Sequence, residues 1–400
     1  MLIAQACVEG CAPEEAAARI AERLDVATRG APSWVTAHHG AGMPADALRR
    51  ALGERLWGDA PPALHGGGSC LGVMSSDGAF IAEGDGTGAL ALWDPEGDYG
   101  VGRAVLGDGP RKAGAEAARR AMQAARRSGE APDLVWITAA PGAEESVIAG
   151  VEDAVGATTR IVGGSAADND VSGSWAVFDG AQAMNDGVVV SALYPSTPIA
   201  TGFRSGYAPT GASGRVTRAE GRTLSEIDGR PARAVFAEWT GGAVVAAEGP
   251  DAPILAASSW APLGREFDAV AGVPFHLLAH PALARADGGV DLFAAVGVGE
   301  TVHQMTGSPD RLNTRAGRLA REVLGDETVA GAAAGALVVF CGGSMLAMRD
   351  RMEEVVSGLR ASLGKTPFLG LFTFGEQGAT LDGGNRHGNL MISCTIFGSG

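Results

Sequence analysis

The chain has 400 residues, of which 46% are hydrophobic and 19% charged, and its formal net charge is −15 at pH 7. This length predicts two domains, and the negative charge argues against nucleic acid and anionic membrane surfaces as partners. No apolar stretch approaches the roughly 18 residues of a membrane span, and the N-terminus lacks the basic and apolar regions of a secretory signal. The five scattered cysteines are typical of reduced thiols, so we expect a cytoplasmic protein.

Strand-like and helix-like patterns alternate along the chain and predict an α/β fold. We expect a helical segment over residues 1–30, followed by a unit of strand, helix, strand and hairpin. The same order of elements occurs three times, in residues 33–93, 134–194 and 336–397. The predicted helices include 45–57 in the first unit and 345–363 in the third. The sequence therefore predicts two domains of mixed β-sheets flanked by helices, built from recurring strand–helix–strand–hairpin units.

A different pattern, rich in strands and turns, separates the second unit from the third. Within it, residues 249–265 are irregular and are expected to cover a surface, and a helix is predicted near residues 309–325. The boundary between the two domains is expected between residues 195 and 225, where the pattern changes. We therefore expect an N-terminal domain over residues 31–222 and a C-terminal domain over residues 223–400.

The second strand of each unit runs into a loop of small residues that carries a polar or reactive group. These loops are GGGSC with Cys70, GGSAAD with Ser165 and Asp168, and FGEQG with Glu376. Open α/β sheets bind ligands at the carboxyl ends of their strands. The middle loop lacks the lysine of a phosphate-binding loop, the glycines of a dinucleotide fingerprint and the elbow of a hydrolase. It is either a turn, with Asp168 or Asn169 bonded to its own backbone, or a loop whose glycines let a ligand approach.

Further polar side chains follow the third loop, where Asn385, Arg386, His387 and Asn389 lie between two predicted strands. Together with Glu376 they are expected to converge on one ligand, and the guanidinium of Arg386 suits a carboxylate. His387 is a general base, a metal or haem ligand, or a hydrogen-bonded turn residue. These alternatives stay open at the level of sequence.

Three other features are candidates for a site. Cys341 stands at a predicted strand end before a helix, where a thiol pKa is lowered, and it is either reactive or a buried inert cysteine. Tyr207 lies in a predicted loop and either lines a pocket or fills a domain interface. His276 and His280 are four residues apart and would share one face of a helix, but prolines bracket them. We therefore expect no metal site.

Several stretches carry a family resemblance: GGGSCLGVMSSDG, DPEGDYGVG, PGAEESVIAGV leading into IVGGSAADND, SGYAPTG, IDGRPA, and FGEQG with NRHGNLMIS. On these motifs the chain resembles the FIST family, in which a FIST N-terminal domain precedes a FIST C-terminal domain. The resemblance implies a soluble two-domain sensor of small ligands, of the bacterial type. One branch of the family resembles haem-binding nitric-oxide sensors, and another is fused to F-box segments. No F-box or output domain accompanies the motifs here, so a separate signalling protein is the expected partner.

These observations predict a cytoplasmic signal-transduction protein that binds a small polar ligand, such as an amino acid or a related metabolite, in a pocket formed by strand-end loops. The expected ligand-binding residues are Ser165, Asp168, Asn169, Tyr207, Glu376, Asn385, Arg386, His387 and Asn389. Two alternatives stay open. One is a haem-binding nitric-oxide sensor, with haem as its cofactor. The other is an enzyme in which His387 or Glu376 is the base and Cys70 or Cys341 the nucleophile.

Overall fold

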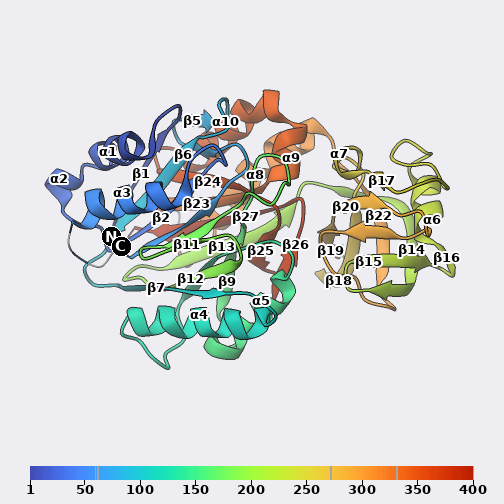
Figure 1. Cartoon of the computed structure of the whole chain (residues 1–400), viewed down its shortest axis with the longest axis horizontal. Helices are drawn as coiled ribbons and strands as arrows, with labels where there is room; N and C mark the ends of the chain where they lie inside the picture. Colours follow the sequence, from blue (N-terminus) through green and yellow to red (C-terminus); the bar gives the residue numbers. More distant parts are fainter. Residues whose placement is uncertain (59, 61–62, 271–272, 330–331, 400) are drawn as a thin grey trace.

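The computed structural model describes residues 1–58, 60, 63–270, 273–329 and 332–399. Figure 1 shows two bodies side by side: the larger contains both ends of the chain, in blue and red, and the smaller contains a middle segment in yellow and orange. We call the smaller one the inserted β domain, residues 208–306, and the larger one the three-sheet body. Within the described ranges, no helix is both long and apolar enough to cross a membrane.

Three six-stranded sheets form the three-sheet body. In spatial order, sheet 1 contains β1 (Leu2–Val8), β6 (Thr87–Trp93), β2 (Trp34–His39), β3 (Leu64–Gly68), β10 (Val177–Asp179) and β11 (Ala183–Met184). Sheet 2 contains β26 (Asn385–Gly388), β25 (Glu376–Ala379), β9 (Arg160–Ser165), β8 (Leu134–Ala139), β12 (Gly187–Tyr194) and β7 (Asp98–Val105). Sheet 3 contains β13 (Ile199–Ser205), β27 (Met391–Gly398), β23 (Ala333–Cys341), β24 (Phe368–Thr373), β4 (Val73–Ser75) and β5 (Gly78–Phe80).

The three recurring units predicted from the sequence are present, one at the centre of each sheet. Each unit supplies a parallel pair of strands: β2 with β3, β8 with β9, and β23 with β24. The hairpin that follows each pair does not stay in its own sheet. Instead β4–β5 joins sheet 3, β10–β11 joins sheet 1 and β25–β26 joins sheet 2. The units therefore exchange hairpins in a closed circle, which ties each sheet to a neighbour.

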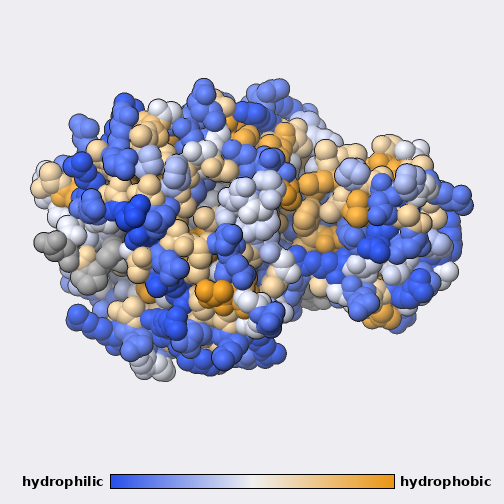
Figure 2. All heavy atoms as spheres, viewed as in Figure 1, coloured by the Kyte–Doolittle hydropathy of each residue, from blue (hydrophilic) through white to orange (hydrophobic). Residues whose placement is uncertain are grey.

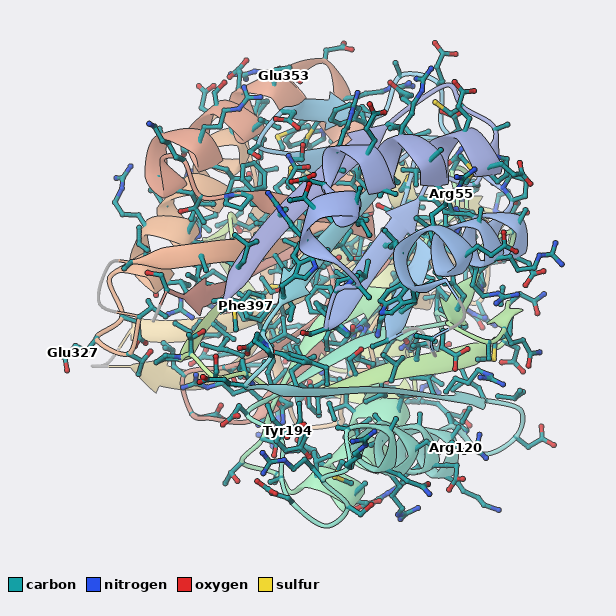
Figure 3. The ribbon with its side chains drawn as sticks, turned by 90° about the vertical axis from the view of Figure 1, so that its left-hand side faces the viewer. Arg55, Arg120, Tyr194, Glu327, Glu353 and Phe397 are labelled. Carbon is teal, nitrogen blue, oxygen red and sulfur yellow. The ribbon has the colours of Figure 1, made fainter. Side chains whose placement is uncertain are left out.

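Helices cover the outer faces of the sheets, as connections between parallel strands require. Sheet 1 is covered by α1 (Pro13–Arg23), α2 (Val26–Arg29) and α3 (Ala45–Trp57), sheet 2 by α4 (Pro110–Ala124) and α5 (Glu144–Val155), and sheet 3 by α8 (Pro309–Leu324), α9 (Gly342–Ala347) and α10 (Met352–Leu363). Figure 3 places Arg55, Arg120 and Glu353 on these outer helices, with Phe397 between the sheets. The inner faces pack on one another through Trp34, Trp136, Leu337 and Leu369.

The inserted β domain has its own core and connects to the three-sheet body at two points in the chain. Its nine-stranded sheet is built from β14 (Ala208–Glu220), β15 (Thr223–Ile227), β16 (Arg230–Pro231), β17 (Ala252–Pro253), β18 (Leu263–Val270), β19 (Val273–Ala279), β20 (Pro281–Ala284), β21 (Val290–Leu292) and β22 (Thr301–Thr306), with α6 (Ala232–Trp239) and α7 (Leu255–Ser258) beside it. Its core includes Val216, Leu224, Phe236 and Val302.

Several predicted boundaries compare directly with the structure. The helix predicted over 45–57 is α3, and the one near 309–325 is α8. The helix predicted over 345–363 is divided into α9, a 3-10 turn at Arg349–Arg351, and α10. Residues 1–30, expected to be helical, begin with strand β1 because it pairs along its length with β6. The division at residue 222 stays a prediction; in space, sheet 3 combines strands from both sides of it.

Candidate functional site

The three strand-end loops identified in the sequence meet in the interior of the three-sheet body. The amide of Cys70 donates to the carbonyl of Phe372 at 2.9 Å, and the amide of Ala167 donates to the carbonyl of Gly68 at 3.0 Å. The amide of Ser165 donates to the carbonyl of Gly375 at 2.8 Å. Each loop is thus fixed by backbone hydrogen bonds to another unit, and this closure leaves the loops little freedom to move independently.

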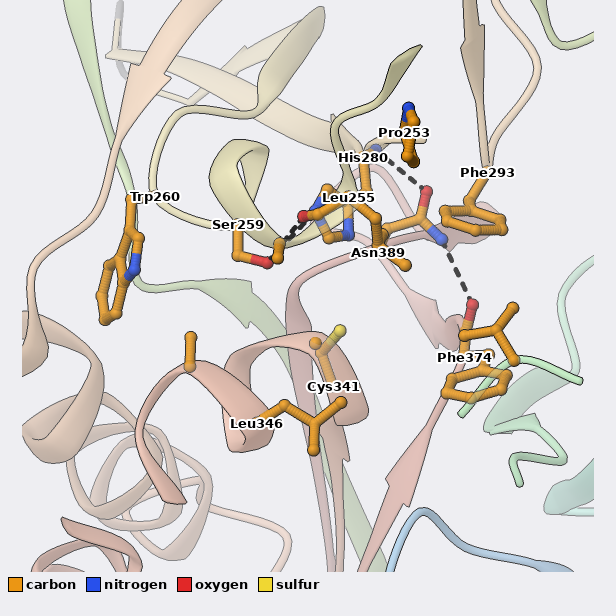
Figure 4. A pocket seen from close by; sticks show the side chains of 14 residues that line it. Pro253, Leu255, Ser259, Trp260, His280, Phe293, Cys341, Leu346, Phe374 and Asn389 are labelled. Atoms are coloured by element: carbon orange, nitrogen blue, oxygen red, sulfur yellow. Dashed lines mark hydrogen bonds between the residues drawn. The ribbon is translucent and has the colours of Figure 1, made fainter. Parts of the chain in front are cut away.

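A cavity of about 510 Å³ opens beside the third loop, between the two bodies. The inserted β domain contributes Pro253, Leu255, Ala256, Ser259, Trp260, His280 and Phe293 to its wall, and the three-sheet body contributes Val171, Cys341, Gly343, Leu346, Ala347, Phe374 and Asn389. Figure 2 shows hydrophobic side chains gathered where the bodies meet. In Figure 4, Trp260 lies at one end of the cavity and Phe293 and Phe374 at the other, with Cys341 and Leu346 below. A cavity of this size and lining is typical of small-molecule sites.

Two polar side chains, His280 and Asn389, form part of the cavity wall (Figure 4). The side-chain oxygen of Asn389 accepts the backbone N–H of His280 at 3.2 Å. The Nε2 atom of His280 lies 3.0 Å from the carbonyl of Leu255, and because a carbonyl only accepts, Nε2 carries the proton and Nδ1 is an acceptor. Burial lowers the pKa of His280 to about 4. The ring is therefore neutral at pH 7.

Cys341 and Glu376 lie together on the side of the three-sheet body. Cys341 ends β23 and lines the cavity, and burial raises the pKa of its thiol well above the ordinary value. Glu376 is fully buried and accepts the backbone N–H of Met391 at 2.9 Å and the hydroxyl of Thr373 at 2.8 Å. Burial raises the pKa of Glu376 to about 8. Both groups are therefore predominantly neutral at pH 7, in contrast to the lowered thiol pKa expected from the sequence.

The backbone beside the cavity is held in a conformation that bulky residues rarely adopt. Leu390, which follows Asn389, has φ of 53°, and Val171 has φ of 62°. For a β-branched residue such as Val171 a positive φ is an outlier. Each such residue costs on the order of 1–3 kcal/mol and persists only where its surroundings fix it. The strain therefore lies in two loops that contribute to the same cavity.

A buried polar network links the three-sheet body to the inserted β domain. The hydroxyl of Ser165 donates to Glu144 at 2.7 Å, and Gln377 donates to Ser165 at 3.3 Å. Arg222 of the inserted β domain forms ion pairs with Glu144 and, at 2.8 Å, with Glu145. Burial acts to raise the pKa of Glu145, but His387 and Arg222 outweigh it and hold that pKa at about 2. The network therefore joins the two bodies through charged groups, of which Glu144 is buried and Arg222 and Glu145 are partly exposed.

The comparisons with known proteins cover most of the chain. A sequence model of the FIST N domain matches residues 39–230, and one of the FIST C domain matches residues 232–379. The chain belongs to the FIST family. FIST domains are sensory domains of signal transduction.

Comparison with other proteins adds no information on the activity of this FIST protein. No protein of curated function matches its sequence. Among solved structures, the crystal structure of cyanuric acid hydrolase from A. caulinodans is similar at 11% identity and a TM-score of 0.41, with 100% of this chain and 99% of that chain covered. A similarity of this size supports no conclusion about catalysis.

The structure separates the ligand-binding residues expected from the sequence of this FIST protein. Asp168 accepts the backbone N–H groups of Val171 at 2.6 Å and Gly173 at 2.7 Å. Asn169 accepts the N–H of Leu71 at 2.8 Å and donates to the carbonyl of Gly84 at 2.9 Å. Both side chains are thus engaged by the protein backbone. The interpretation of GGSAAD as a turn describes Asp168, whose partners are local, whereas Asn169 connects the loop to distant parts of the chain. Neither lines the 510 Å³ cavity.

The residues of the NRHGN segment also lie at different places in the structure. Asn385 holds its hairpin to sheet 2, because it accepts the N–H of Ile161 at 2.8 Å and donates to Glu152 at 2.9 Å. Arg386 and His387 line a second, more polar cavity of about 380 Å³, whose other members include Glu145, Glu152, Arg265, Glu266 and Glu300. Asn389 lines the 510 Å³ cavity. The segment therefore reaches two cavities and does not converge on one.

The remaining candidates have structural partners. The hydroxyl of Tyr207 donates to the carbonyl of Ser259 at 2.7 Å and so bridges the junction of the two bodies. Cys70 is fully buried, and burial raises the pKa of its thiol to about 12. His276 and His280 do not share a helix face: His276 lies on β19, against His303, while His280 follows β19 and lines the 510 Å³ cavity.

Sequence reasoning missed most of the 510 Å³ cavity. Its wall includes Leu255, Trp260, Phe293 and Leu346, which are apolar residues of the kind that also fill ordinary cores. Of the residues on its wall, Cys341 and Asn389 were candidates from the sequence, and His280 was considered only as one of a histidine pair for which no metal site was expected. Residues 249–265 were expected to cover a surface, and the surface they cover is the cavity.

Proposed function

We propose that this FIST protein is a sensor that binds a small ligand with an apolar body and an uncharged polar end in the 510 Å³ cavity. The observation that supports the proposal is the position of the cavity, with one wall from the three-sheet body and the other from the inserted β domain. A ligand that contacts both walls stabilises one relative orientation of the two bodies. Such a change in orientation is a means by which a sensor passes a signal to a separate partner.

The chemistry of the wall defines the class of ligand. Among the described residues that line the cavity, none carries a charge at pH 7. Asn389, Ser259 and the Nδ1 atom of His280 offer neutral hydrogen-bonding groups, while Trp260, Phe293 and Phe374 offer apolar surface. A free amino acid, with two opposite charges, requires paired charges when it is buried. The charged groups line the 380 Å³ cavity, which is the proposed location for an amino acid.

The Cys341–Glu376 pair is better suited to binding than to nucleophilic catalysis. A cysteine nucleophile acts as a thiolate, whereas burial raises the pKa of Cys341 far above neutrality. A carboxyl with a pKa of about 8 is a poor candidate for an ionised base at pH 7. Cys341 therefore contributes a neutral thiol to the cavity wall, and Glu376, which is fully buried and does not line the cavity, lies next to it.

The proposal is tested by screening metabolites against the full chain by thermal shift and titration calorimetry, with Leu346→Glu as the pocket variant. Leu346 lines the cavity and its side chain is 43% exposed, so a charged replacement folds while placing a carboxylate against the ligand. Leu381→Glu, at a site 52% exposed and outside the cavity, is the matched control. We expect the pocket variant to weaken binding at least about tenfold, from the cost of an unpaired charge beside apolar groups, and the control to leave it unchanged.

Each other outcome contradicts a stated part of the proposal. Equal affinities in the two variants refute the assignment of the cavity. An amino acid whose affinity falls in Arg386→Gln, and not in Leu346→Glu, moves the ligand to the 380 Å³ cavity. A Soret band on haem addition that is lost in His280→Ala replaces the proposal with the haem sensor, and chemical conversion of a bound compound replaces it with an enzyme.

A further inference from the structure

Three adjacent strands of the inserted β domain bring two histidines and a carboxylate together. Glu266 on β18 lies directly opposite His276 on β19, and Gly264, two residues before Glu266, lies opposite His303 on β22. Residues two apart on a strand share a face, and cross-strand partners share it too. The three side chains therefore project from the same face of the sheet, although they are up to 37 positions apart in sequence.

The distances within this cluster suit a single metal ion. One ligand atom from each side chain can be chosen so that all three lie within 4.8 Å of one another. The Nε2 atom of His303 is 2.9 Å from Glu266, and the rings of His276 and His303 meet edge to face with centroids 4.7 Å apart. Tetrahedral Zn²⁺ with bonds of about 2.0–2.1 Å separates its ligand atoms by roughly 3.4 Å. Small rotations of side chains bring the cluster to that spacing.

Gly264 gives the cluster room. A Cβ at this position would lie 2.7 Å from the sulfur of Met305 and 3.3 Å from the Cβ of His276. A larger residue at the centre of the three strands would therefore displace His276 from His303. Because Gly264 has no side chain, the space above the sheet at this position is free for the three polar side chains.

His276 offers a ring nitrogen that the rest of the protein does not use. Burial, and then the neighbouring His303, lower the pKa of His276, so its ring is neutral at pH 7. Within the described part of the chain, the buried Nε2 atom of His276 has no hydrogen-bond partner. A buried ring nitrogen without a partner has lost its hydrogen bonds to water and gained none from the protein, which destabilises the fold. A metal ion bound at this nitrogen, or at a water beside it, removes that cost.

We propose that Glu266, His276 and His303 bind one divalent transition-metal ion of the Zn²⁺ class. Two imidazoles and one carboxylate are a ligand set that Zn²⁺ uses when it keeps a coordination position open. Mg²⁺ and Ca²⁺ prefer sites made of oxygen ligands alone, so the set disfavours them. None of the three residues lines the 510 Å³ cavity, whereas Glu266 also lines the 380 Å³ cavity.

The location of the site indicates what the metal does. His276 also lines a cavity of about 310 Å³ together with Arg204 and Tyr207, which lie where the chain passes from the three-sheet body into the inserted β domain. A bound ion joins three strands of that domain next to this connection. The ion therefore rigidifies the domain on the side from which it contacts the three-sheet body.

The experiment is a calorimetric titration of Zn²⁺ into the chelator-treated full chain, repeated with Mg²⁺. The variants are His276→Ala, His303→Gln and Glu266→Gln, and the matched control is Glu220→Gln, an exposed carboxylate of the same domain. We expect one Zn²⁺ per chain in the wild type and the control, a loss of affinity of at least about tenfold in either histidine variant, and no binding of Mg²⁺.

A second readout separates this site from the cysteines. Co²⁺ bound to histidine and carboxylate gives visible bands without the thiolate charge-transfer band that cysteine ligands produce. Circular dichroism and the Tm of the metal-free variants establish that each one folds. The proposal is overturned if the wild type binds no Zn²⁺ at about 100 µM, if both histidine variants bind as the wild type does, or if the Co²⁺ spectrum shows thiolate ligands.

Discussion

Replacement of Glu376 by glutamine tests the electrostatics beside the cavity. Burial raises the pKa of this carboxyl from 4.5 to about 8. Between these values the folded chain holds a proton that the unfolded chain has released. The contribution of this group to stability is therefore complete below pH 4.5 and is lost as the pH rises toward 8.

The size of the effect follows from the linkage between protons and folding. One proton difference changes the free energy of unfolding by about 1.4 kcal/mol per pH unit. Between pH values of about 5.5 and 7.5 the wild type is expected to lose about 3 kcal/mol from Glu376 alone. Glutamine is neutral throughout, has nearly the same shape, and can accept from Met391 and donate to Thr373. The variant should therefore gain about 3 kcal/mol relative to the wild type over this range.

The measurement is urea-induced unfolding of the wild type, Glu376→Gln and Glu220→Gln at several pH values. Other titrating groups are common to all three proteins, so only the difference from the wild type carries the effect. For Glu220→Gln, at an exposed site, the difference should not vary with pH. If the Glu376→Gln difference is also constant between these pH values, the carboxyl is already ionised in the folded chain and the account of the site is wrong.

Two further substitutions test the junction and the packing. Arg222→Ala leaves Glu144, which is only 2% exposed, without its cationic partner, so we expect a loss of about 3 kcal/mol in unfolding free energy, with Arg222→Lys intermediate; an unchanged Tm in Arg222→Ala would show that the ion pairs do not stabilise the junction. Gly150→Ala places a Cβ 1.8 Å from the carbonyl oxygen of Arg111, which forces α4 and α5 apart, so urea unfolding should show a loss of about 1–3 kcal/mol; wild-type stability would contradict the observed helix contact.

The sequence by itself determined the local elements and their recurrence. Helix 45–57 was predicted with the bounds that α3 has, because the spacing of its apolar residues and the flanking turn residues act within a few positions. The three strand–helix–strand–hairpin units were visible for the same reason. The family could also be recognised from the sequence, since its motifs lie in short loops with characteristic residues.

Only the tertiary structure decided which sheet each hairpin joins. Alternating apolar residues show that a strand has a buried face, but they do not say which sheet buries it. Strand β25 pairs with β9, more than 200 positions earlier in the chain, through Glu376 opposite Gly164. The closed exchange of hairpins depends on such long-range pairings, which local patterns do not encode.

The same long-range packing placed the predicted site residues in two different cavities. Arg386 and Asn389 are three residues apart, yet they line different cavities, because the segment runs along the inserted β domain and meets it at two places. Residues such as Leu255, Phe293 and Leu346 line a cavity only because the inserted β domain rests against the three-sheet body. In sequence they look like core residues, since burial in a core and exposure to a dry cavity select the same apolar side chains. The polar residues of the strand-end loops were therefore readable from sequence, and the apolar walls of the cavity were not.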